Sequence, residues 1–152
     1  MESQPPADVI ELTARALDVS SAVAHVTDAA AGGIAVFLGT TRAEDSAAKQ
    51  PLVALDYEAY PEMALEQMRA LARSARERWP IARLALLHRT GRVAVSEPSV
   101  IIAVASPHRG EAFDACEWLI DTLKKEVAIW KKEVWRDGSG TWVDPLTPSP
   151  SR

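Results

Sequence analysis

Two lysines near the C-terminal end of the chain have the clearest potential for acid–base chemistry. Lys124 and Lys131 are seven residues apart, about two helical turns, so a continuous helix would place both on one face. Lys124 follows Ile120 by four residues and therefore borders the apolar stripe of that helix. An ammonium group at the edge of a packed face loses part of its water, which favours a lowered pKa or an anionic partner. The alternative is a solvated helix end, where lysines suit the negative pole of the helix dipole.

A second segment, Ser106-Pro-His-Arg109, indicates an anion site independently. Ser106 and Pro107 fit the N-cap and the first position of a helix, which puts His108 and Arg109 in its first turn. Acidic residues are usual there, because the helix N-terminus is electropositive. Two cations in that turn therefore favour a bound phosphate or carboxylate. The alternative is that acidic residues one turn further on neutralise them.

Arg42 is a third candidate, because it follows the apolar run at residues 34–38 and precedes a small, polar loop at residues 43–51. Strand ends and loops are where scaffolds commonly present functional side chains, although most arginines at such points form surface ion pairs. Together these residues form a cationic set that would suit a phosphorylated or otherwise anionic small molecule. Its members are Arg42, His108, Arg109, Lys124, Lys131 and Lys132.

The elements that must position these residues predict an α+β domain, because helices and strands are mixed and joined by antiparallel-style turns. The β-branched run at residues 100–105 is the most apolar strand and is expected to be central. A helix is expected from Ser106 through Val127, continuing toward Lys131. Further strands are expected at residues 9–13, 34–38, 52–58 and 82–88, a short strand or bulged continuation at 92–95, and helices from Asp18 and from Pro61 to Trp79.

Length and composition restrict the function. The 152 residues suit a single domain, taken as residues 1–143, with a proline-rich tail at 144–152 that is expected to be disordered. A net charge of −4 argues against a general nucleic-acid binder. Cys116 is the only cysteine and is expected in the core, and three scattered histidines give no metal motif. Without a signal peptide or a long apolar run, the chain reads as cytoplasmic.

Several ordered motifs resemble one known family, the large, catalytic subunit of molybdopterin synthase. The resemblance covers about residues 8 to 143, and the order and spacing of the motifs make it more specific than any motif alone. The matching segments are Phe37-Leu-Gly-Thr-Thr-Arg42, Leu55-Asp-Tyr-Glu-Ala-Tyr-Pro-Glu-Met63, Arg78-Trp-Pro80, His88-Arg-Thr-Gly91, Ser106-Pro-His-Arg109, Glu111-Ala-Phe113, Leu123-Lys124 and Ile129-Trp-Lys-Lys-Glu133.

The resemblance implies an α/β-hammerhead fold and a homodimer of large subunits within a heterotetramer. Each large subunit would receive the thiocarboxylated Gly-Gly tail of a small ubiquitin-like subunit. Two sulfurs would then pass to cyclic pyranopterin monophosphate, forming the dithiolene of molybdopterin without a metal or organic cofactor. The alternative is a non-catalytic module that binds an anion or a protein tail. The resemblance implies catalytic roles for Lys124 and Lys131 and substrate-binding roles for Thr40, Thr41, Arg42, His108, Arg109, Lys132 and Glu133.

One position departs from the family pattern. Ala128 stands where many members have proline, just before Ile129 and Trp130. Because alanine does not interrupt a helix as proline does, the expected helix can continue through this position.

Overall fold

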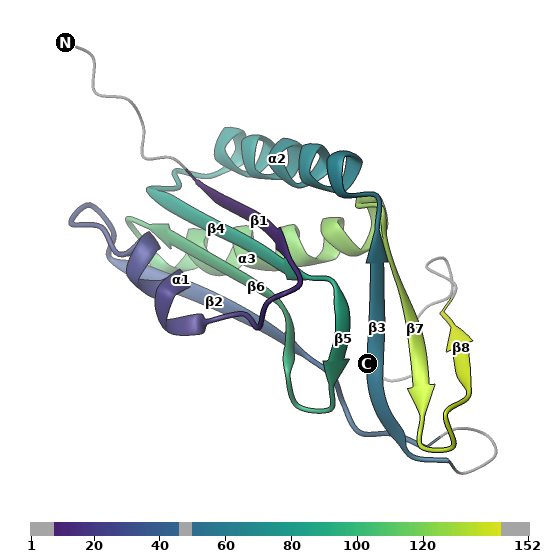
Figure 1. Cartoon of the computed structure of the whole chain (residues 1–152). Coiled ribbons are helices and arrows are strands. Elements are labelled where there is room, and N and C mark those ends of the chain that lie inside the picture. Colours follow the sequence, from purple (N-terminus) through teal and green to yellow (C-terminus); the bar gives the residue numbers. More distant parts are fainter. Residues whose placement is uncertain (1–7, 46–49, 144–152) are drawn as a thin grey trace.

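The computed structural model describes residues 8–45 and 50–143, which form two four-stranded sheets and three helices (Figure 1). The expected tail at residues 144–152 lies outside the described residues, as do residues 1–7 of the expected domain and residues 46–49 of the expected loop. The elements are β1 (Val9–Thr13), α1 (Val19–Val26), β2 (Gly33–Thr40), β3 (Leu52–Ala59), α2 (Pro61–Arg78), β4 (Arg83–Arg89), β5 (Gly91–Ala94), β6 (Pro98–Ser106), α3 (Arg109–Glu126), β7 (Ile129–Trp135) and β8 (Gly140–Trp142).

The first sheet has the strand order β1-β4-β6-β2. Strand β6 pairs antiparallel with both β4 and β2, and β1 joins β4 in parallel. All of β6 after Pro98 is buried, because helices cover both of its faces. The prediction of a central strand at residues 100–105 is therefore confirmed, and its β-branched run is the reason it is buried so completely.

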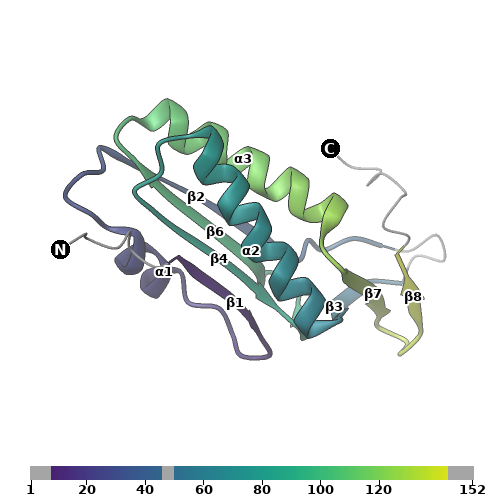
Figure 2. The same cartoon turned by 90° about the horizontal axis from the view of Figure 1, so that it is seen from above.

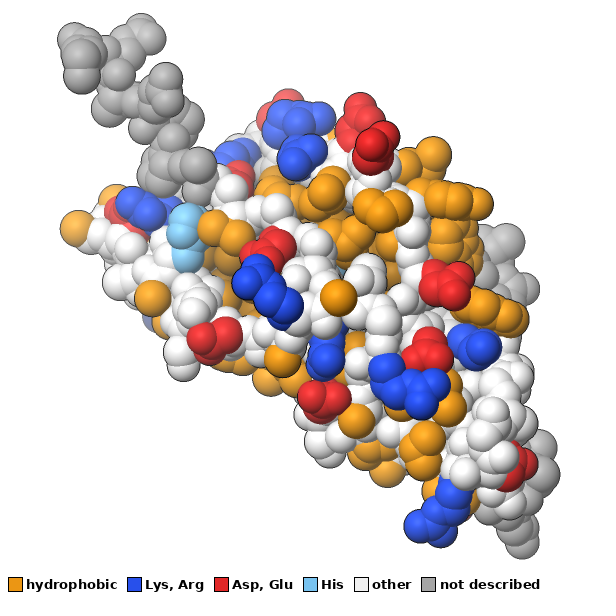
Figure 3. Space-filling model, in the orientation of Figure 1, with side chains coloured by type: hydrophobic (Ala, Val, Ile, Leu, Met, Phe, Trp, Pro, Cys, Tyr) orange, Lys and Arg blue, Asp and Glu red, His pale blue; other side chains and the backbone are white. Residues whose placement is uncertain are grey.

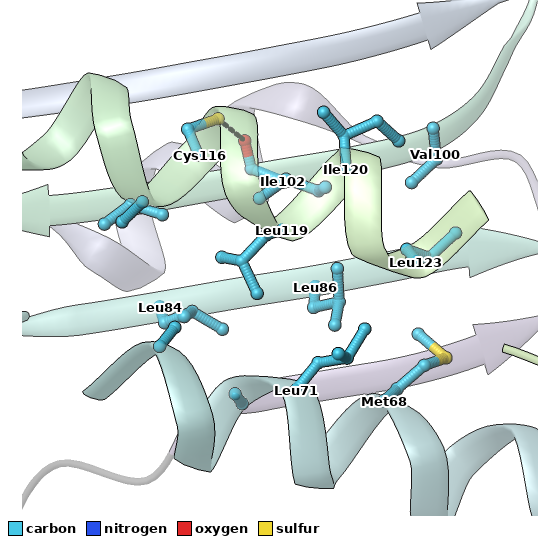
Figure 4. Packing of buried hydrophobic residues seen from close by; sticks show 14 of the residues in the cluster. Met68, Leu71, Leu84, Leu86, Val100, Ile102, Cys116, Leu119, Ile120 and Leu123 are labelled. Atoms are coloured by element: carbon cyan, nitrogen blue, oxygen red, sulfur yellow. Dashed lines mark hydrogen bonds between the residues drawn. The ribbon is translucent and has the colours of Figure 1, made fainter. Parts of the chain in front are cut away.

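Two layers of helices enclose this sheet. Helices α2 and α3 lie on one face and α1 lies on the other (Figures 1 and 2). Alternating residues of β6 serve the two faces: Ile102 packs under α2 and α3, and Ile101 packs under α1. Figure 4 shows the larger core, to which α2 contributes Met68 and Leu71 and α3 contributes Leu119 and Leu123 over the sheet. Cys116 lies in this core as predicted, and burial raises the pKa of its thiol to about 11.

The second sheet has the order β5-β3-β7-β8 and stands beside the first (Figure 1). The chain leaves the first sheet at the end of β4 and enters the second through Gly91, whose φ of 81° suits a glycine at this turn. The short strand expected near residues 92–95 is therefore β5, paired with β3. This second sheet carries Lys131, so its register decides what surrounds that lysine.

Helix α3 begins later than predicted. Ser106 is the last residue of β6, and His108 is the N-cap of α3, without a side-chain hydrogen bond. The assignment of Ser106 and Pro107 as N-cap and first helical residue is therefore wrong by two positions. Pairing explains the difference, because Ser106 is paired with Gly33 and its carbonyl accepts a hydrogen bond from the Gly32 N–H. These sheet contacts hold Ser106 in extended conformation.

Helix α3 also ends earlier than predicted, so the continuous helix from Lys124 to Lys131 is wrong. The helix stops at Glu126, where the extended Val127 donates its N–H to the Leu123 carbonyl. Strand β7 starts three residues later and pairs with β3 along its whole length. A strand partner satisfies every second backbone group of this segment, which outweighs the modest helix propensity of its residues. The two lysines therefore belong to different elements.

Candidate active site

Lys131 lies on β7 directly opposite Tyr57 of β3. Side chains alternate along a strand, so Lys131 shares its face with Glu133, two residues on, and Lys132 projects to the opposite face. On the Lys131 face the sheet also packs Tyr57 against a small buried cluster that includes Leu55. Lys131 lies beside this packing and is only half exposed.

The surroundings of Lys131 make its ammonium group unusually acidic. Burial lowers the pKa of Lys131, and the positive charges of Lys124 and Arg42 lower it further. The carboxylates of Glu133 and Glu44 act in the opposite direction. A lysine with a lowered pKa releases its proton more readily near neutral pH, which is the property required of a general acid.

Lys124 reaches this site from the last turn of α3, where it is exposed to solvent. Because α3 ends at Glu126 and the chain turns directly into β7, two residues of helix, two of link and two of strand separate the two lysines. The two lysines are nevertheless close enough for the charge of Lys124 to lower the pKa of Lys131, and a helix–strand junction, not a helical face, brings them together.

A pair of carboxyl groups lies next to Lys131. Glu133 lies within hydrogen-bonding reach of Glu44, and two carboxyl groups interact favourably only when one of them is protonated. Burial raises the pKa of Glu133, and the hydrogen bond and charge of Glu44 raise it further, whereas Lys131 lowers it. Glu44 also contacts Arg42, with 3.4 Å between the Arg42 Nη2 and the Glu44 Oε2. The two cations and two carboxyls thus form one mixed cluster.

Replacing Glu44 by glutamine is expected to lower the pKa of Glu133. An amide can donate a hydrogen bond to the Glu133 carboxylate and carries no charge to oppose its ionisation. Titration of the glutamate carboxyl carbons by NMR would measure the change. Asp45→Asn is the matched control, because it removes one negative charge from the next position, and Asp45 does not contribute to the pKa of Glu133. A Glu133 titration that is the same in Glu44→Gln and the wild type would contradict this interaction between the two carboxyl groups.

The two threonines that were predicted to bind substrate differ in accessibility. Thr40 ends β2 and is exposed. Thr41 is 2% exposed, and its hydroxyl donates to the Val93 carbonyl over 3.5 Å. Its backbone also bonds the turn after β5, with Ser96 donating to the Thr41 carbonyl. Thr41 therefore ties β2 to the second sheet and holds Arg42 in place, which is a supporting position.

His88 and Tyr57 lie next to Lys131. Their rings meet edge to face with centroids 5.0 Å apart. The His88 Nδ1 lies 2.8 Å from the Arg89 carbonyl oxygen, which can only accept, so Nδ1 carries the proton. Burial lowers the pKa of His88 to about 4, against the effect of this hydrogen bond, and the charge of Lys131 adds to the lowering. The prediction of a structural role for His88 agrees with its 4% exposure.

Three of the predicted binding residues lie away from Lys131 in this chain. His108 and Arg109 are exposed at the start of α3, and Lys124 lies fifteen positions after Arg109 along the helix. At 1.5 Å per residue that separation is about 22 Å. Figure 2 shows α3 running from the far end of the first sheet toward β7. Lys132 faces the other side of the second sheet, with its Nζ 5.5 Å from the centre of the Trp142 ring.

Other kinds of site find little support in the part of the chain that the structure describes. Within residues 8–45 and 50–143, no three His, Cys, Asp or Glu side chains form a group that could hold a metal ion. No helix in those ranges is long and apolar enough to cross a membrane. Figure 3 shows Lys and Arg side chains interspersed with Asp and Glu over one face, in keeping with the net charge of −4. A basic groove for nucleic acid is not visible on that face.

Comparison with protein families gives one match over most of the chain. The family described as "MoaE protein" matches residues 12–126. Among curated relatives, the "Molybdopterin synthase catalytic subunit" of Rattus norvegicus is 38% identical over 139 residues, which is 91% of this chain and 68% of that protein. Both matches include Arg42 and the whole of α3, the elements that frame the site.

Solved structures show the same fold. The molybdopterin synthase structure from Staphylococcus aureus superposes with a TM-score of 0.83 at 31% identity, covering 89% of this chain and 96% of that one. A more distant likeness is to a chain in the "Protein-protein complex of subunit 1 and 2 of Molybdopterin-converting factor" from Helicobacter pylori 26695. It has a TM-score of 0.68 at 20% identity, covers 92% of this chain and 91% of that one, and shows the fold alone. The α/β-hammerhead prediction is confirmed by these likenesses.

Proposed function

Because the chain belongs to the MoaE protein family, we propose that it is the catalytic subunit of a molybdopterin synthase, a sulfur-transferring enzyme of molybdenum cofactor biosynthesis. The observation that carries the proposal is the half-buried Lys131, whose pKa is lowered by burial and by the charges of Lys124 and Arg42. A structural lysine gains nothing from two neighbouring cations, since like charges destabilise the folded state. A lysine that must release a proton does gain from them.

The sulfur donor in this proposal is a small subunit whose C-terminal Gly-Gly tail ends in a thiocarboxylate. The Helicobacter pylori structure, which is a complex of two subunits, supports such an arrangement for this fold. The tail would approach the cluster of Lys124, Lys131 and Arg42, whose charges suit both the thiocarboxylate and an anionic substrate. We also propose a cytoplasmic location, as expected for an enzyme of cofactor synthesis.

The chemistry assigned to the chain is proton transfer and charge stabilisation. In each of two rounds the thiocarboxylate sulfur forms a C–S bond to the side chain of cyclic pyranopterin monophosphate and displaces an oxygen. Water then cleaves the acyl C–S bond of the resulting thioester, which leaves the sulfur on the substrate and an ordinary carboxylate on the tail. Lys131 and Lys124 polarise the thiocarboxylate and protonate the oxygen that leaves. Arg42 holds the anionic substrate, and Glu133, with Glu44, sets the protonation of Lys131. Because the sulfur arrives on the partner, these steps require only water and the side chains named above.

A second copy of the chain is part of the proposal, because His108 and Arg109 lie about 22 Å from Lys124 within one copy. Strand β2 supports self-association. It is an edge strand without a charged residue, and its Ile34, Val36 and Leu38 are each 40% exposed. Gly33, at the start of β2, packs against the Arg109 backbone, so a copy that covered β2 would also lie beside this helix N-terminus. A copy seated there would bring its own His108 and Arg109, at the N-terminus of α3, into the assembly, where they suit a phosphate group.

A reconstituted conversion assay tests the proposed function. The purified chain is mixed with a small subunit carrying a thiocarboxylated tail and with cyclic pyranopterin monophosphate, and molybdopterin is measured. We expect two sulfurs to be transferred per product. The matched control is the same small subunit with an ordinary carboxylate tail, which is expected to bind but to yield no product. Tight binding of the thiocarboxylated partner without any sulfur transfer would instead support the non-catalytic, tail-binding alternative.

A further inference from the structure

The link between α3 and β7 determines how far apart the two candidate catalytic lysines lie. Lys124 is in the last helical turn and Lys131 is the third residue of the strand. Only Val127 and Ala128 connect the two elements. A change of conformation at either residue therefore moves one lysine relative to the other. Helix ends open more easily than any other part of a helix, so this link needs support from outside α3.

The support comes from α2. The Ala128 N–H donates to the side-chain Oε1 of Gln67 over 2.7 Å. Gln67 lies within the 18-residue helix α2, next to Met68, which is fully buried in the core. The oxygen that holds Ala128 is thus carried by a rigid element, 61 residues away in sequence. Among the described residues, Gln67 provides the only side-chain hydrogen bond to the link of Val127 and Ala128.

The link itself is tightly folded around Ala128. The Ile129 N–H donates to the Val127 carbonyl over 2.8 Å, which closes a three-residue turn centred on Ala128. Val127 is extended, and it is buried in the core. The Ala128 N–H points out of this turn and would lose its partner if Gln67 were absent. An unpaired, partly buried N–H is costly, so the link would then rearrange to reach water.

We propose that Gln67 is a positioning residue for the active site, holding the Ala128 amide so that Lys124 and Lys131 keep their separation. Its role in turnover rests on the proposed function, whereas its role in geometry does not. Gln67 touches neither lysine, and it acts through the backbone of the link. This assignment adds α2 to the elements that build the site.

A double-mutant cycle tests the proposal. Gln67→Met keeps the length of the side chain and removes the acceptor. Ala128→Pro removes the donor, and the link accommodates it, because φ near −75° at the centre of such a turn suits proline and the preceding Val127 is already extended. We expect Gln67→Met to lower kcat about 10-fold in the natural background, with little change in KM for the small subunit, since small misplacements of catalytic groups are costly. In the Ala128→Pro background the same substitution is expected to change kcat less than about twofold.

The control variant is Glu66→Met, which changes the neighbouring exposed position of α2 to the same residue and leaves the link untouched. Its kcat is expected to match the wild type. Equal losses from Gln67→Met in both backgrounds would overturn the proposal, because the residue would then act through something other than the Ala128 amide. No loss from Gln67→Met in the natural background would overturn it as well.

A second readout does not depend on sulfur transfer. The rate at which an amine-reactive acylating reagent labels Lys131 rises with pH as the ammonium loses its proton, and peptide mass spectrometry follows it. In Gln67→Met we expect the midpoint to move to higher pH, because Lys124 is no longer held close. The other groups that face Lys131 stay in place. They are Arg42 and Glu44 from the β2–β3 connection, Tyr57 from β3, His88 from β4 and Glu133 from β7 itself.

The two readouts separate the inference from the function on which it rests. A shifted labelling midpoint in a chain that transfers no sulfur would retain the positioning role and remove the proposed function. An unshifted midpoint, together with normal sulfur transfer by Gln67→Met, would retain the function and remove the positioning role.

Discussion

Lys131→Ala is expected to lower the turnover of the reconstituted enzyme by about 10²–10⁴-fold, the range that a positioned general acid contributes. The expectation follows from the surroundings of Lys131, where burial and the charges of Lys124 and Arg42 prepare the ammonium group to release its proton. Folding should survive, because the side chain is half exposed and its removal empties little of the interior. Single-turnover measurements of molybdopterin formation, with circular dichroism as the check on folding, would measure the effect.

Two further variants separate proton transfer from simple charge. Lys131→Arg keeps the positive charge, but a guanidinium does not give up its proton, so this variant should be nearly as inactive as alanine. Lys125→Ala removes a lysine from the exposed last turn of α3, beside Lys124, and should retain wild-type turnover. Full activity in Lys131→Arg would show that the site uses the charge alone. Full activity in Lys131→Ala would remove Lys131 from the chemistry.

The local patterns of the sequence were sufficient where a short segment determines its own structure. Asp18 caps α1 through its side chain, which accepts from the Ser20 N–H, as its place before the helix predicted. Pro61 begins α2, and the chain leaves that helix at Trp79 before Pro80, as predicted. The apolar run of β6 likewise predicted its central place. At the two helix boundaries the deciding interactions lie within a few residues of one another, and in β6 the apolar composition of a single segment was signal enough.

The same patterns failed where residues far apart in the sequence determine the local structure. The stretch from Val127 to Glu133 has no strong preference of its own, and pairing with β3 makes it a strand. The separation of Arg109 from Lys131 follows from the length of α3 and could not be read from the types of the residues. Glu44 was missed because its partner Glu133 is 89 positions away, and a single glutamate in a polar loop carries no signal. Gln67 was missed for the same reason.

His88 gives the second large effect, which concerns stability as a function of pH. In the folded chain burial lowers the pKa of His88 to about 4, whereas the ordinary value is 6.5. The unfolded chain therefore binds more protons than the folded chain between these two values. Stability from this residue is fully present above pH 6.5 and is lost as the pH falls toward 4, below which the loss is complete. The gap between the two values corresponds to about 3 kcal/mol.

His88→Asn tests this expectation. The asparagine amide can still donate to the Arg89 carbonyl, as the His88 Nδ1 does, but it does not titrate. The variant should be less stable at pH 7, because it leaves part of the ring's space empty, and its stability should fall less than that of the wild type between pH 6.5 and pH 4. Urea unfolding at a series of pH values measures how the free energy of unfolding changes with pH in the wild type and in His88→Asn. His25→Asn, on α1, is the control for losing a histidine that is only partly buried. An equal pH dependence of the free energy of unfolding in the wild type and His88→Asn would show that His88 takes up its proton without leaving the folded interior. The neutral imidazole assigned next to Lys131 would then be wrong.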